Sequence, residues 1–355
     1  MEMTFRWFGE KNDSIKLDDI RQIPNVRGIV WTLLDQPVGE VWPESEIAQE
    51  VEKIRKKGFH PEVVESLNIH EDIKLGKPSR DDYIEKYIRT MELLSKYGVK
   101  VICYNFMPVF DWIRTDLEKP LEDNSTAMHY EHEILSNMTP AELIKNMKDN
   151  TTFELPGWEK EKLDIIQELF TEYRSVTKKD LWNNLKYFLD AVIPRAEELD
   201  IKLAIHPDDP PWSLFELPRI ISDKNDLKKV INLHPSTHNG ITFCTGSLGA
   251  NRENDLEEIA GEFIDKIFFA HIRNIRYLNK TDFVETSHRE SDGNIPIVSI
   301  IEILQKNNYK YYIRPDHGRQ IWNEKCRPGY GLYDRALGIM YLNGIIDHII
   351  KEEKH

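Results

Sequence analysis

The sequence predicts an α/β protein built as a closed (β/α)8 TIM barrel, and three observations indicate this fold. Short runs rich in Val, Ile and aromatic residues alternate with amphipathic helical patterns, which is typical of a parallel sheet covered by helices. Eight such runs can be counted, which favours a closed barrel over an open sheet. The chain has 355 residues, and α/β barrels with insertions commonly exceed about 250 residues as one domain. We therefore expect residues 1–355 to form a single domain.

The eight runs follow one another with helical patterns between them. The first, "GIVWTL", precedes a helix with Ile47, Val51 and Ile54 on one face. That helix should stop at Gly58, and the helix after the second run, "VVESL", should stop at Gly98. The strands that we expect, in chain order, are residues 28–33, 63–67, 99–106, 201–207, 240–246, 266–274, 283–289 and 309–317.

The stretch from about 109 to 180 is too long for an ordinary connection between a strand and a helix. Two helical patterns lie within it, at residues 139–150 and 157–174. Because the stretch follows the third predicted strand, it leaves the barrel at the face where the catalytic sites of such barrels lie. We expect a helical lid over that face rather than a second domain.

Composition excludes several classes of function. Lys and Arg number 47 against 61 Asp and Glu, and the net charge of −14 disfavours nucleic acid and anionic membranes as partners. No apolar run approaches the roughly 20 residues of a membrane span, and "MEMTFRWFGEKND" lacks the regions of a signal peptide. Cys103, Cys244 and Cys326 are odd in number and far apart, which argues against a disulfide framework. We expect a cytoplasmic protein with no nucleic-acid or membrane partner.

Four potential metal ligands follow predicted strands at the end where barrel strands converge. They are His206 after "LAI", Cys244 after "ITF", His271 after "FFA" and Asp316 after "YYIRP". A lone histidine or cysteine at such a position is more often structural, but here all four share one end of the barrel. Thiolate and imidazole select transition metals over Mg²⁺ and Ca²⁺, while the carboxylate keeps Mn²⁺ and Fe²⁺ acceptable. The pattern predicts a transition-metal site at the barrel mouth.

Further polar residues surround the predicted site. In "RPDHGR", Arg314 can bind a substrate carboxylate through its planar fork, and His317 can transfer a proton. The alternatives for these two residues are a strand-end ion pair and a helix cap. Tyr330 lies on a glycine-bordered loop that can fold over the site. His70 follows the second predicted strand, where it either contributes to the site or caps the loop.

Longer blocks of the chain resemble the mannonate dehydratase family of hexuronate catabolism, from near the first residue to about Ile350. The blocks include "VVESLNIHEDIKLG", "YNFMPVFDWIRTDL", "LAIHPDDPPW", "ITFCTGSLGA", "FFAHIRNI" and "YIRPDHGR" with "RPGYGLYDRALG". The resemblance implies a xylose-isomerase-like barrel and a homo-oligomeric lyase that converts D-mannonate to 2-keto-3-deoxy-D-gluconate with Mn²⁺ or Fe²⁺. It places the metal on His206, Cys244, His271 and Asp316, and substrate binding and proton transfer on Arg314, His317 and Tyr330.

Dehydration of a sugar acid accounts for these residue types. The C2 proton must leave beside a carboxylate, and the C3 hydroxyl must depart, so a metal and Arg314 would stabilise the developing charge. His317 is then the favoured base and Tyr330 the acid, although the order is reversible. A sugar isomerase or epimerase on the same barrel, and a non-catalytic sugar-acid sensor, are the alternatives. Trp31 and Gln36 depart from the family pattern near the first predicted strand, so the resemblance does not imply the pocket shape there.

Overall fold

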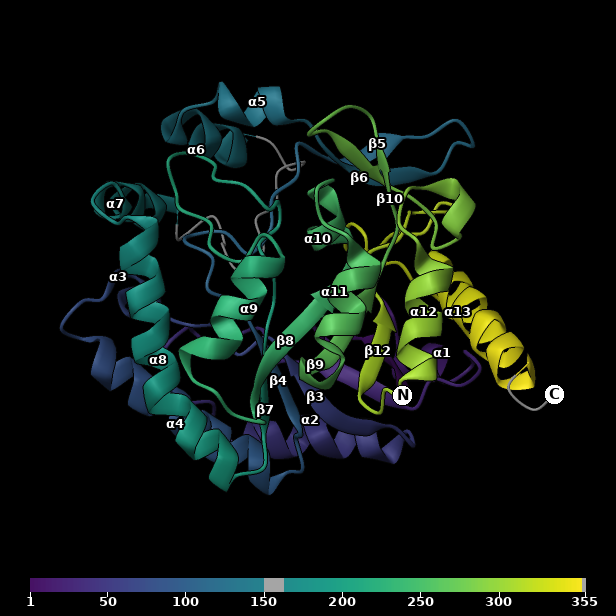
Figure 1. The fold of residues 1–355 in the computed structure, drawn as a ribbon, viewed down its shortest axis with the longest axis horizontal. Helices are drawn as coiled ribbons and strands as arrows, with labels where there is room; N and C mark the ends of the chain where they lie inside the picture. Colours follow the sequence, from purple (N-terminus) through teal and green to yellow (C-terminus); the bar gives the residue numbers. More distant parts are fainter. Residues whose placement is uncertain (150–162, 353–355) are drawn as a thin grey trace.

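Eight parallel strands close into a barrel, which confirms the predicted (β/α)8 fold (Figure 1). The structure is a computed structural model, and it describes residues 1–149 and 163–352. The barrel closes where β1 pairs with both β2 and β12, with Phe5 opposite Ile29 and Met3 opposite Ile313. In order around the barrel, the strands are β1 (Glu2–Arg6), β2 (Gly28–Trp31), β3 (His60–Glu65), β4 (Val101–Tyr104), β7 (Lys202–Ile205), β8 (Asn239–Cys244), β9 (Ile267–Ile272) and β12 (Tyr312–Pro315).

Seven of the eight expected strands belong to the barrel, and one assignment was wrong. The run at 283–289 contains β11 (Phe283–Glu285), which pairs antiparallel with β10 (Ile275–Tyr277) in a second sheet. The missing barrel strand is β1, whose sequence "EMTFR" does not form a continuous apolar run. Thr4 and Arg6 interrupt it, and both are buried. Strands were predicted from continuous apolar runs, so a strand that contains buried polar residues was missed.

Helices cover the outside of the barrel and bury their apolar faces against it (Figure 1). As predicted, α2 buries Ile47, Val51 and Ile54 and ends just before Gly58, whose positive φ of 85° suits glycine. No helix within the described ranges is long and apolar enough to cross a bilayer. The covering helices are α1 (Leu17–Ile20), α2 (Glu44–Lys56), α4 (Arg80–Lys96), α8 (Lys178–Glu198), α9 (Lys224–Leu233), α11 (Leu256–Glu262), α12 (Ile297–Lys306) and α13 (Leu332–Glu352), and shorter pieces are α3 (Glu71–Leu75), α10 (Thr245–Ala250), η2 (Ile264–Lys266) and η3 (Glu290–Asp292).

The long insertion follows β4, the third predicted strand and the fourth in the barrel, and it contains a hairpin as well as helices. The helical patterns at 139–150 and 157–174 agree with α6 and α7, although residues 150–162 lie outside the described part. The hairpin of β5 and β6 was not expected, and neither was the pairing of β6 with β11, which comes from a distant segment. Together they form a four-stranded sheet in the order β10-β11-β6-β5, above the barrel in Figure 1. The elements of the insertion are β5 (Asp116–Pro120), β6 (Thr126–Tyr130), α5 (His132–Ser136), α6 (Pro140–Asp149) and α7 (Leu163–Tyr173).

Candidate metal centre and active site

The barrel interior places polar side chains directly beyond an apolar layer. Ala204 and Phe269 belong to a buried apolar cluster formed by inward-facing residues of the strands. Because side chains alternate along a strand, residues two positions further face the same way. His206 and His271 are therefore directed into the carboxyl-terminal mouth. Cys244 is the last residue of β8 and lies opposite His271 of β9 in the strand register.

The structure brings three of the four predicted metal ligands together. The potential ligand atoms of His206, Cys244 and His271 all lie within 4.8 Å of one another. The two imidazole rings are 5.1 Å apart between centroids. The fourth predicted ligand, Asp316, borders this group, with Oδ2 at 3.6 Å from the Cys244 sulfur. A single ion could therefore be reached from four separate βα units.

The hydrogen bonding of these side chains fits a divalent transition metal. His206 donates from Nδ1 to the Pro207 carbonyl at 2.7 Å, so Nε2 is the nitrogen that would bind a metal. Neither ring nitrogen of His271 has a hydrogen-bond partner, although the side chain is fully buried, and burial holds its pKa well below the usual value. Ser247 donates to the Cys244 sulfur at 3.1 Å. A neutral imidazole without partners is costly in a protein interior unless a ligand uses its lone pair.

His206 and Cys244 also interact electrostatically. Burial lowers the pKa of His206, but Cys244, with Glu65 and Asp316, more than offsets this, and the pKa rises to about 9. The pair therefore carries a proton that a bound cation would displace, as is general for metal sites built from imidazole and thiolate.

A second group of potential ligand atoms shares His271 with Glu65 and Cys103. This group is a poorer metal site because burial raises the pKa of Cys103 well above the usual value, so its thiol keeps its proton. Thr242 donates to the Cys103 sulfur at 3.2 Å, as expected of a structural cysteine. A third group, at the opposite, amino-terminal end of the barrel, consists of Glu2, His60 and Glu62.

Arg314 contacts protein carboxylates rather than an open pocket. Its Nη2 donates to Glu65 Oε1 at 3.0 Å, and its Nη1 lies 2.9 Å from Asp316 Oδ1. Burial opposes ionisation of Asp316, but neighbouring cationic groups, Arg314 among them, hold its pKa well below the usual value. Arg314 therefore forms the ion pair that the sequence allowed as its alternative role, and it keeps Asp316 ionised. Glu65 was not among the predicted site residues.

His317 and Tyr330 form a hydrogen-bonded pair next to Asp316. The Tyr330 hydroxyl lies 3.0 Å from His317 Nε2. On the other side of the ring, Nδ1 lies 3.0 Å from both Glu285 Oε1 and Arg273 Nη1. Burial, with the charge of Asp316, raises the pKa of Tyr330, so its phenol keeps its proton at neutral pH. The structure therefore joins the predicted base and the predicted acid directly.

Four buried charged residues that we did not predict surround this pair. Arg114 donates two hydrogen bonds to the Asp209 carboxylate, at 2.8 and 3.0 Å, and one to Glu285 at 2.9 Å. Arg273 donates to Asp209 at 2.6 Å and also contacts Glu285. These residues come from the insertion, from the loops after β7 and β9, and from β11. A signal was present for two of them, because Asp209 and Arg273 follow predicted ligands by two or three residues.

His70 does not contact this site in the described part of the chain. Its Nδ1 accepts from the Asp72 amide at 3.1 Å as the N-cap of α3, and its ring stacks on Tyr83 at 3.6 Å. It therefore has the capping role that the sequence allowed as an alternative. Trp31 and Gln36 also point elsewhere, the first to the Pro61 carbonyl and the second to an exposed glutamate.

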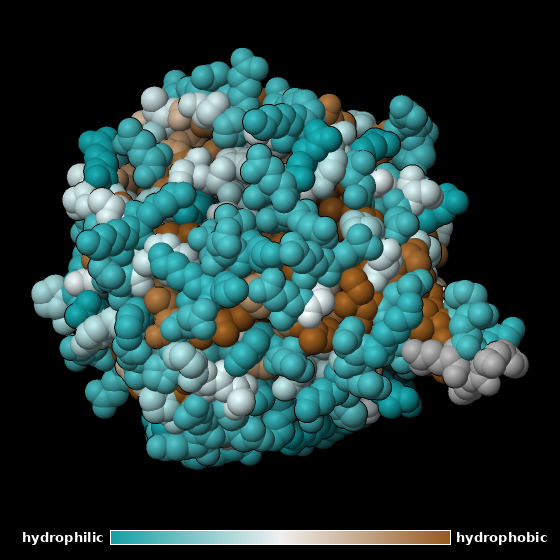
Figure 2. Space-filling model, viewed as in Figure 1, coloured by the Kyte–Doolittle hydropathy of each residue, from teal (hydrophilic) through white to brown (hydrophobic). Residues whose placement is uncertain are grey.

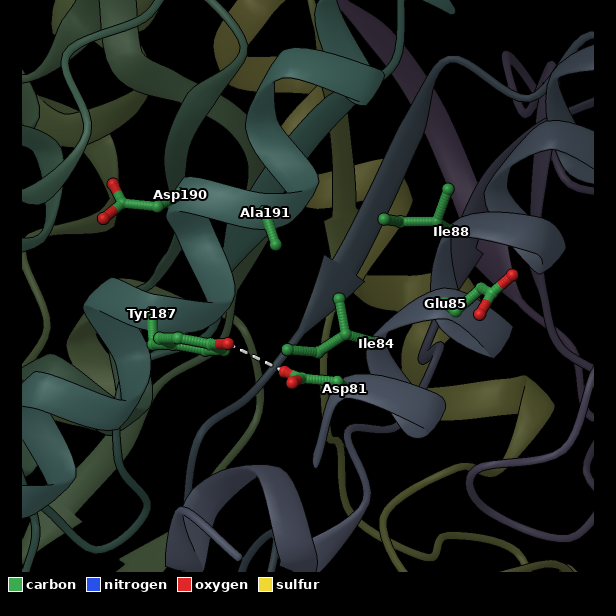
Figure 3. A pocket seen from close by; sticks show the side chains of 7 residues that line it. All are labelled: Asp81, Ile84, Glu85, Ile88, Tyr187, Asp190 and Ala191. Atoms are coloured by element: carbon green, nitrogen blue, oxygen red, sulfur yellow. Dashed lines mark hydrogen bonds between the residues drawn. The ribbon is translucent and has the colours of Figure 1, made fainter. Parts of the chain in front are cut away.

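An open groove lies on the outer face of the barrel, between α4 and α8 (Figure 3). The hydroxyl of Tyr187 spans it and donates to Asp81 at 2.8 Å. No histidine or cysteine lines the groove, so it is not a second metal centre. The lining residues are Asp81, Ile84, Glu85, Ile88, Tyr187, Asp190 and Ala191.

Comparison with known proteins agrees with this geometry. The family model described as D-mannonate dehydratase (UxuA) matches residues 1–355. Mannonate dehydratase 1 of Halalkalibacterium halodurans is 57% identical over 349 residues, which are 98% of this chain and 97% of that protein. Mannonate dehydratase of Bacillus subtilis is 54% identical over 347 residues, 98% of this chain and 97% of that protein.

Two solved structures support the fold. The crystal structure of mannonate dehydratase from Streptococcus suis has 38% identity and a TM-score of 0.90, covering 100% of this chain and 95% of that one. A xylose isomerase domain protein from Planctomyces limnophilus has only 10% identity and a TM-score of 0.57, with 98% of each chain covered. The second likeness shows a shared xylose-isomerase-like barrel and no more.

Proposed function

Since the chain belongs to the D-mannonate dehydratase family, it is a hydro-lyase of hexuronate catabolism, and we propose how its residues carry out the reaction. The substrate is D-mannonate and the product 2-keto-3-deoxy-D-gluconate. We assign a single Mn²⁺ or Fe²⁺ to His206, Cys244, His271 and Asp316. The observation that supports this assignment is the close group of three donor atoms, one of them on a buried imidazole that makes no hydrogen bond.

When bound, the divalent ion would stabilise negative charge that develops beside the substrate carboxylate. The proton steps fall to His317 and Tyr330. We assign His317 the tautomer that donates from Nδ1 to Glu285, in which Nε2, beside the Tyr330 hydroxyl, is the base that removes the C2 proton. Tyr330 keeps its proton and so serves as the acid that releases the C3 hydroxyl as water.

The contact between the two side chains closes the proton cycle. After the elimination, His317 carries the proton from C2 and Tyr330 has given its own to the leaving hydroxyl. Transfer across their 3.0 Å contact restores both groups. The substrate has then lost water, and the remaining enol becomes the 2-keto acid. We keep Arg314 as a source of positive charge at the mouth, and we assign His70 no contact with substrate.

The experiment that tests this function is turnover of D-mannonate by metal-free protein reloaded with one divalent metal at a time. Mn²⁺ and Fe²⁺ should restore formation of a 2-keto-3-deoxy acid, whereas Mg²⁺ and Ca²⁺ should not. Full turnover by metal-free protein would contradict the proposal. Conversion of an aldose without any keto-deoxy acid would favour a sugar isomerase instead.

We propose that the insertion at about 109–180 acts as a lid over the site. In support, the Trp112 ring packs edge-on against His317, with centroids 5.6 Å apart. Limited proteolysis should cut the insertion preferentially in the empty protein and less with Mn²⁺ and D-mannonate. Equal resistance in both states would indicate a rigid part of the fold.

We also propose that the chain forms a homo-oligomer through one face of α13. Tyr333, Leu337 and Met340 repeat at helical spacing and are 43%, 48% and 47% exposed, and Trp322, 69% exposed, packs on Tyr333. Hydrophobic side chains gather at this edge in Figure 2. Two copies that each carry −14 would repel least where they meet on an uncharged face.

The free thiols of all three cysteines support the cytoplasm as the working compartment.

A further inference from the structure

Two arginines outside the predicted site lie over one aromatic ring beside the catalytic pair. The guanidinium carbon of Arg6 is 4.3 Å from the centroid of the Phe8 ring, and that of Arg327 is 4.6 Å from the same centroid. The Phe8 ring packs edge-on against Tyr330, with centroids 4.8 Å apart. Because Tyr330 contacts His317, this cationic pair is separated from the proposed base and acid by a single aromatic contact.

Neither guanidinium has a carboxylate partner among the described residues. Arg6 is only 5% exposed, and its Nη1 donates to the carbonyls of Trp7 and Val30 at 2.9 and 3.2 Å. Its Nε and Nη2 have no hydrogen-bond partner in the described chain, and the Arg327 side chain has neither a hydrogen bond nor an ion pair there. Four other arginines near the mouth each contact a carboxylate, namely Arg114, Arg273, Arg314 and Arg319. Arg335, which is also buried beside Tyr330, has no carboxylate partner in the described ranges either, but it donates to the backbone carbonyls of Arg6, Tyr330 and Gly331.

A buried cation without a counter-ion is unfavourable, and a second cation nearby makes it more so. Burial lowers the pKa of Arg6 to about 10, and the charges of Arg314 and Arg327 add to that effect while Glu65 opposes it. Glu65 nevertheless makes no ion pair with Arg6, and its Oε1 accepts from Arg314 at 3.0 Å. The arrangement is therefore one that an incoming anion would stabilise.

We propose that Arg6 and Arg327 bind the carboxylate of the sugar acid, the role that the sequence suggested for Arg314. The proposal rests on the dehydratase function and specifies how the site selects an acid over an uncharged sugar. Arg6 ends β1, and Arg327 lies three residues before Tyr330 on the loop to α13. Binding the carboxylate across both would hold that loop against β1. It would also place C2 and C3, the next carbons of the substrate, toward His317 and Tyr330.

Substitution of each arginine by glutamine tests this subsite. In Arg327→Gln and Arg6→Gln, the KM for D-mannonate should rise about 10–100-fold, as expected for the loss of a charge-assisted hydrogen bond. The kcat should change less than the KM, bound metal should be unchanged, and Arg327→Lys should recover part of the affinity. The control is Arg252→Gln, because Arg252 also lies over an aromatic ring, at 4.7 Å from Tyr277, but away from the mouth.

Competition separates recognition of charge from a general loss of structure. Inhibition by D-gluconate, an anion, should weaken in both variants by the same factor as the KM, while weak inhibition by uncharged D-mannitol should not change. The proposal is overturned if the KM of Arg327→Gln matches that of Arg252→Gln, or if both inhibitors weaken together. If Arg6→Gln does not fold, Arg327→Gln alone decides. If the wild type does not turn over D-mannonate, the dehydratase function fails, and D-gluconate binding measured by calorimetry still tests the subsite.

Discussion

Glu285→Gln should destabilise the protein far more than the same change at a surface glutamate. Glu285 is fully buried and lies between Arg114 and Arg273, with Asp209 as the other carboxylate of the group. The substitution keeps the shape but removes the carboxylate that both guanidinium groups share, leaving Asp209 between them and Asp316 at 3.1 Å from Arg273 Nε. Glu92 is a matched control, because it also lies between two arginines, at 2.7 and 2.9 Å, but on the surface of α4.

The expected size follows from the burial of the group. Removing one partner from a buried ion network costs about 3–5 kcal/mol. At roughly 2.1 cal/mol/K per residue, a chain of 355 residues has an unfolding entropy of about 0.75 kcal/mol/K. The Tm should therefore fall by about 4–7 °C in Glu285→Gln. Exposed ion pairs contribute about 0–1 kcal/mol each, so the loss of two should lower the Tm of Glu92→Gln by no more than about 3 °C.

The difference in stability between the wild type and Glu285→Gln should also become smaller as the pH falls. Burial opposes ionisation of Glu285, but its interactions with His317, Arg273 and Arg114 hold its pKa below the usual value. A carboxyl group with a lowered pKa in the folded state contributes stability above its unfolded pKa of about 4.3 and loses it as the pH falls. The gap between wild type and Glu285→Gln should be complete at pH 7 and should shrink below about pH 4.

Thermal unfolding followed by circular dichroism, on metal-free samples at one scan rate and several pH values, provides the assay. Equal Tm shifts for Glu285→Gln and Glu92→Gln at pH 7 would refute the reasoning. So would a gap that widens as the pH falls.

Cys244→Ser should lose bound metal while Cys103→Ser keeps it, as measured by metal analysis of the purified variants, and equal content in both would remove Cys244 from the ligand set. His317→Gln should retain metal but lose turnover by about 10²–10⁴-fold, together with exchange of the C2 hydrogen in heavy water. Near-normal turnover would move the base to another group. Leu337→Glu should shift sedimentation toward the monomer, whereas Leu278→Glu, which alters an equally exposed leucine, should not. An unchanged sedimentation coefficient in both would place the interface elsewhere.

The candidate metal ligands could be predicted from sequence to lie together because a barrel makes strand ends converge. Once the runs before His206, Cys244 and His271 are recognised as strands, closure of the barrel brings the residues at their carboxyl ends to one mouth. This holds for any length or shape of the segments that connect the strands. The count of strands was less secure. "EMTFR" was overlooked and "FVETSHR" was taken for a barrel strand, because apolar content does not reveal which strand a segment pairs with. Both errors concern pairing across long sequence separations, which local patterns do not encode.

The roles of charged residues depend on a different kind of information. Sequence places Arg314 at the mouth, but whether its guanidinium is available to a substrate depends on where carboxylates fall in space. Glu65, its partner at 3.0 Å, is 249 residues away along the chain. With 61 acidic residues against 47 basic ones, the chain has carboxylates enough to neutralise every arginine. Arg6 and Arg327 contact no carboxylate among the described residues, so we expect their positive charge to be available to an anionic substrate.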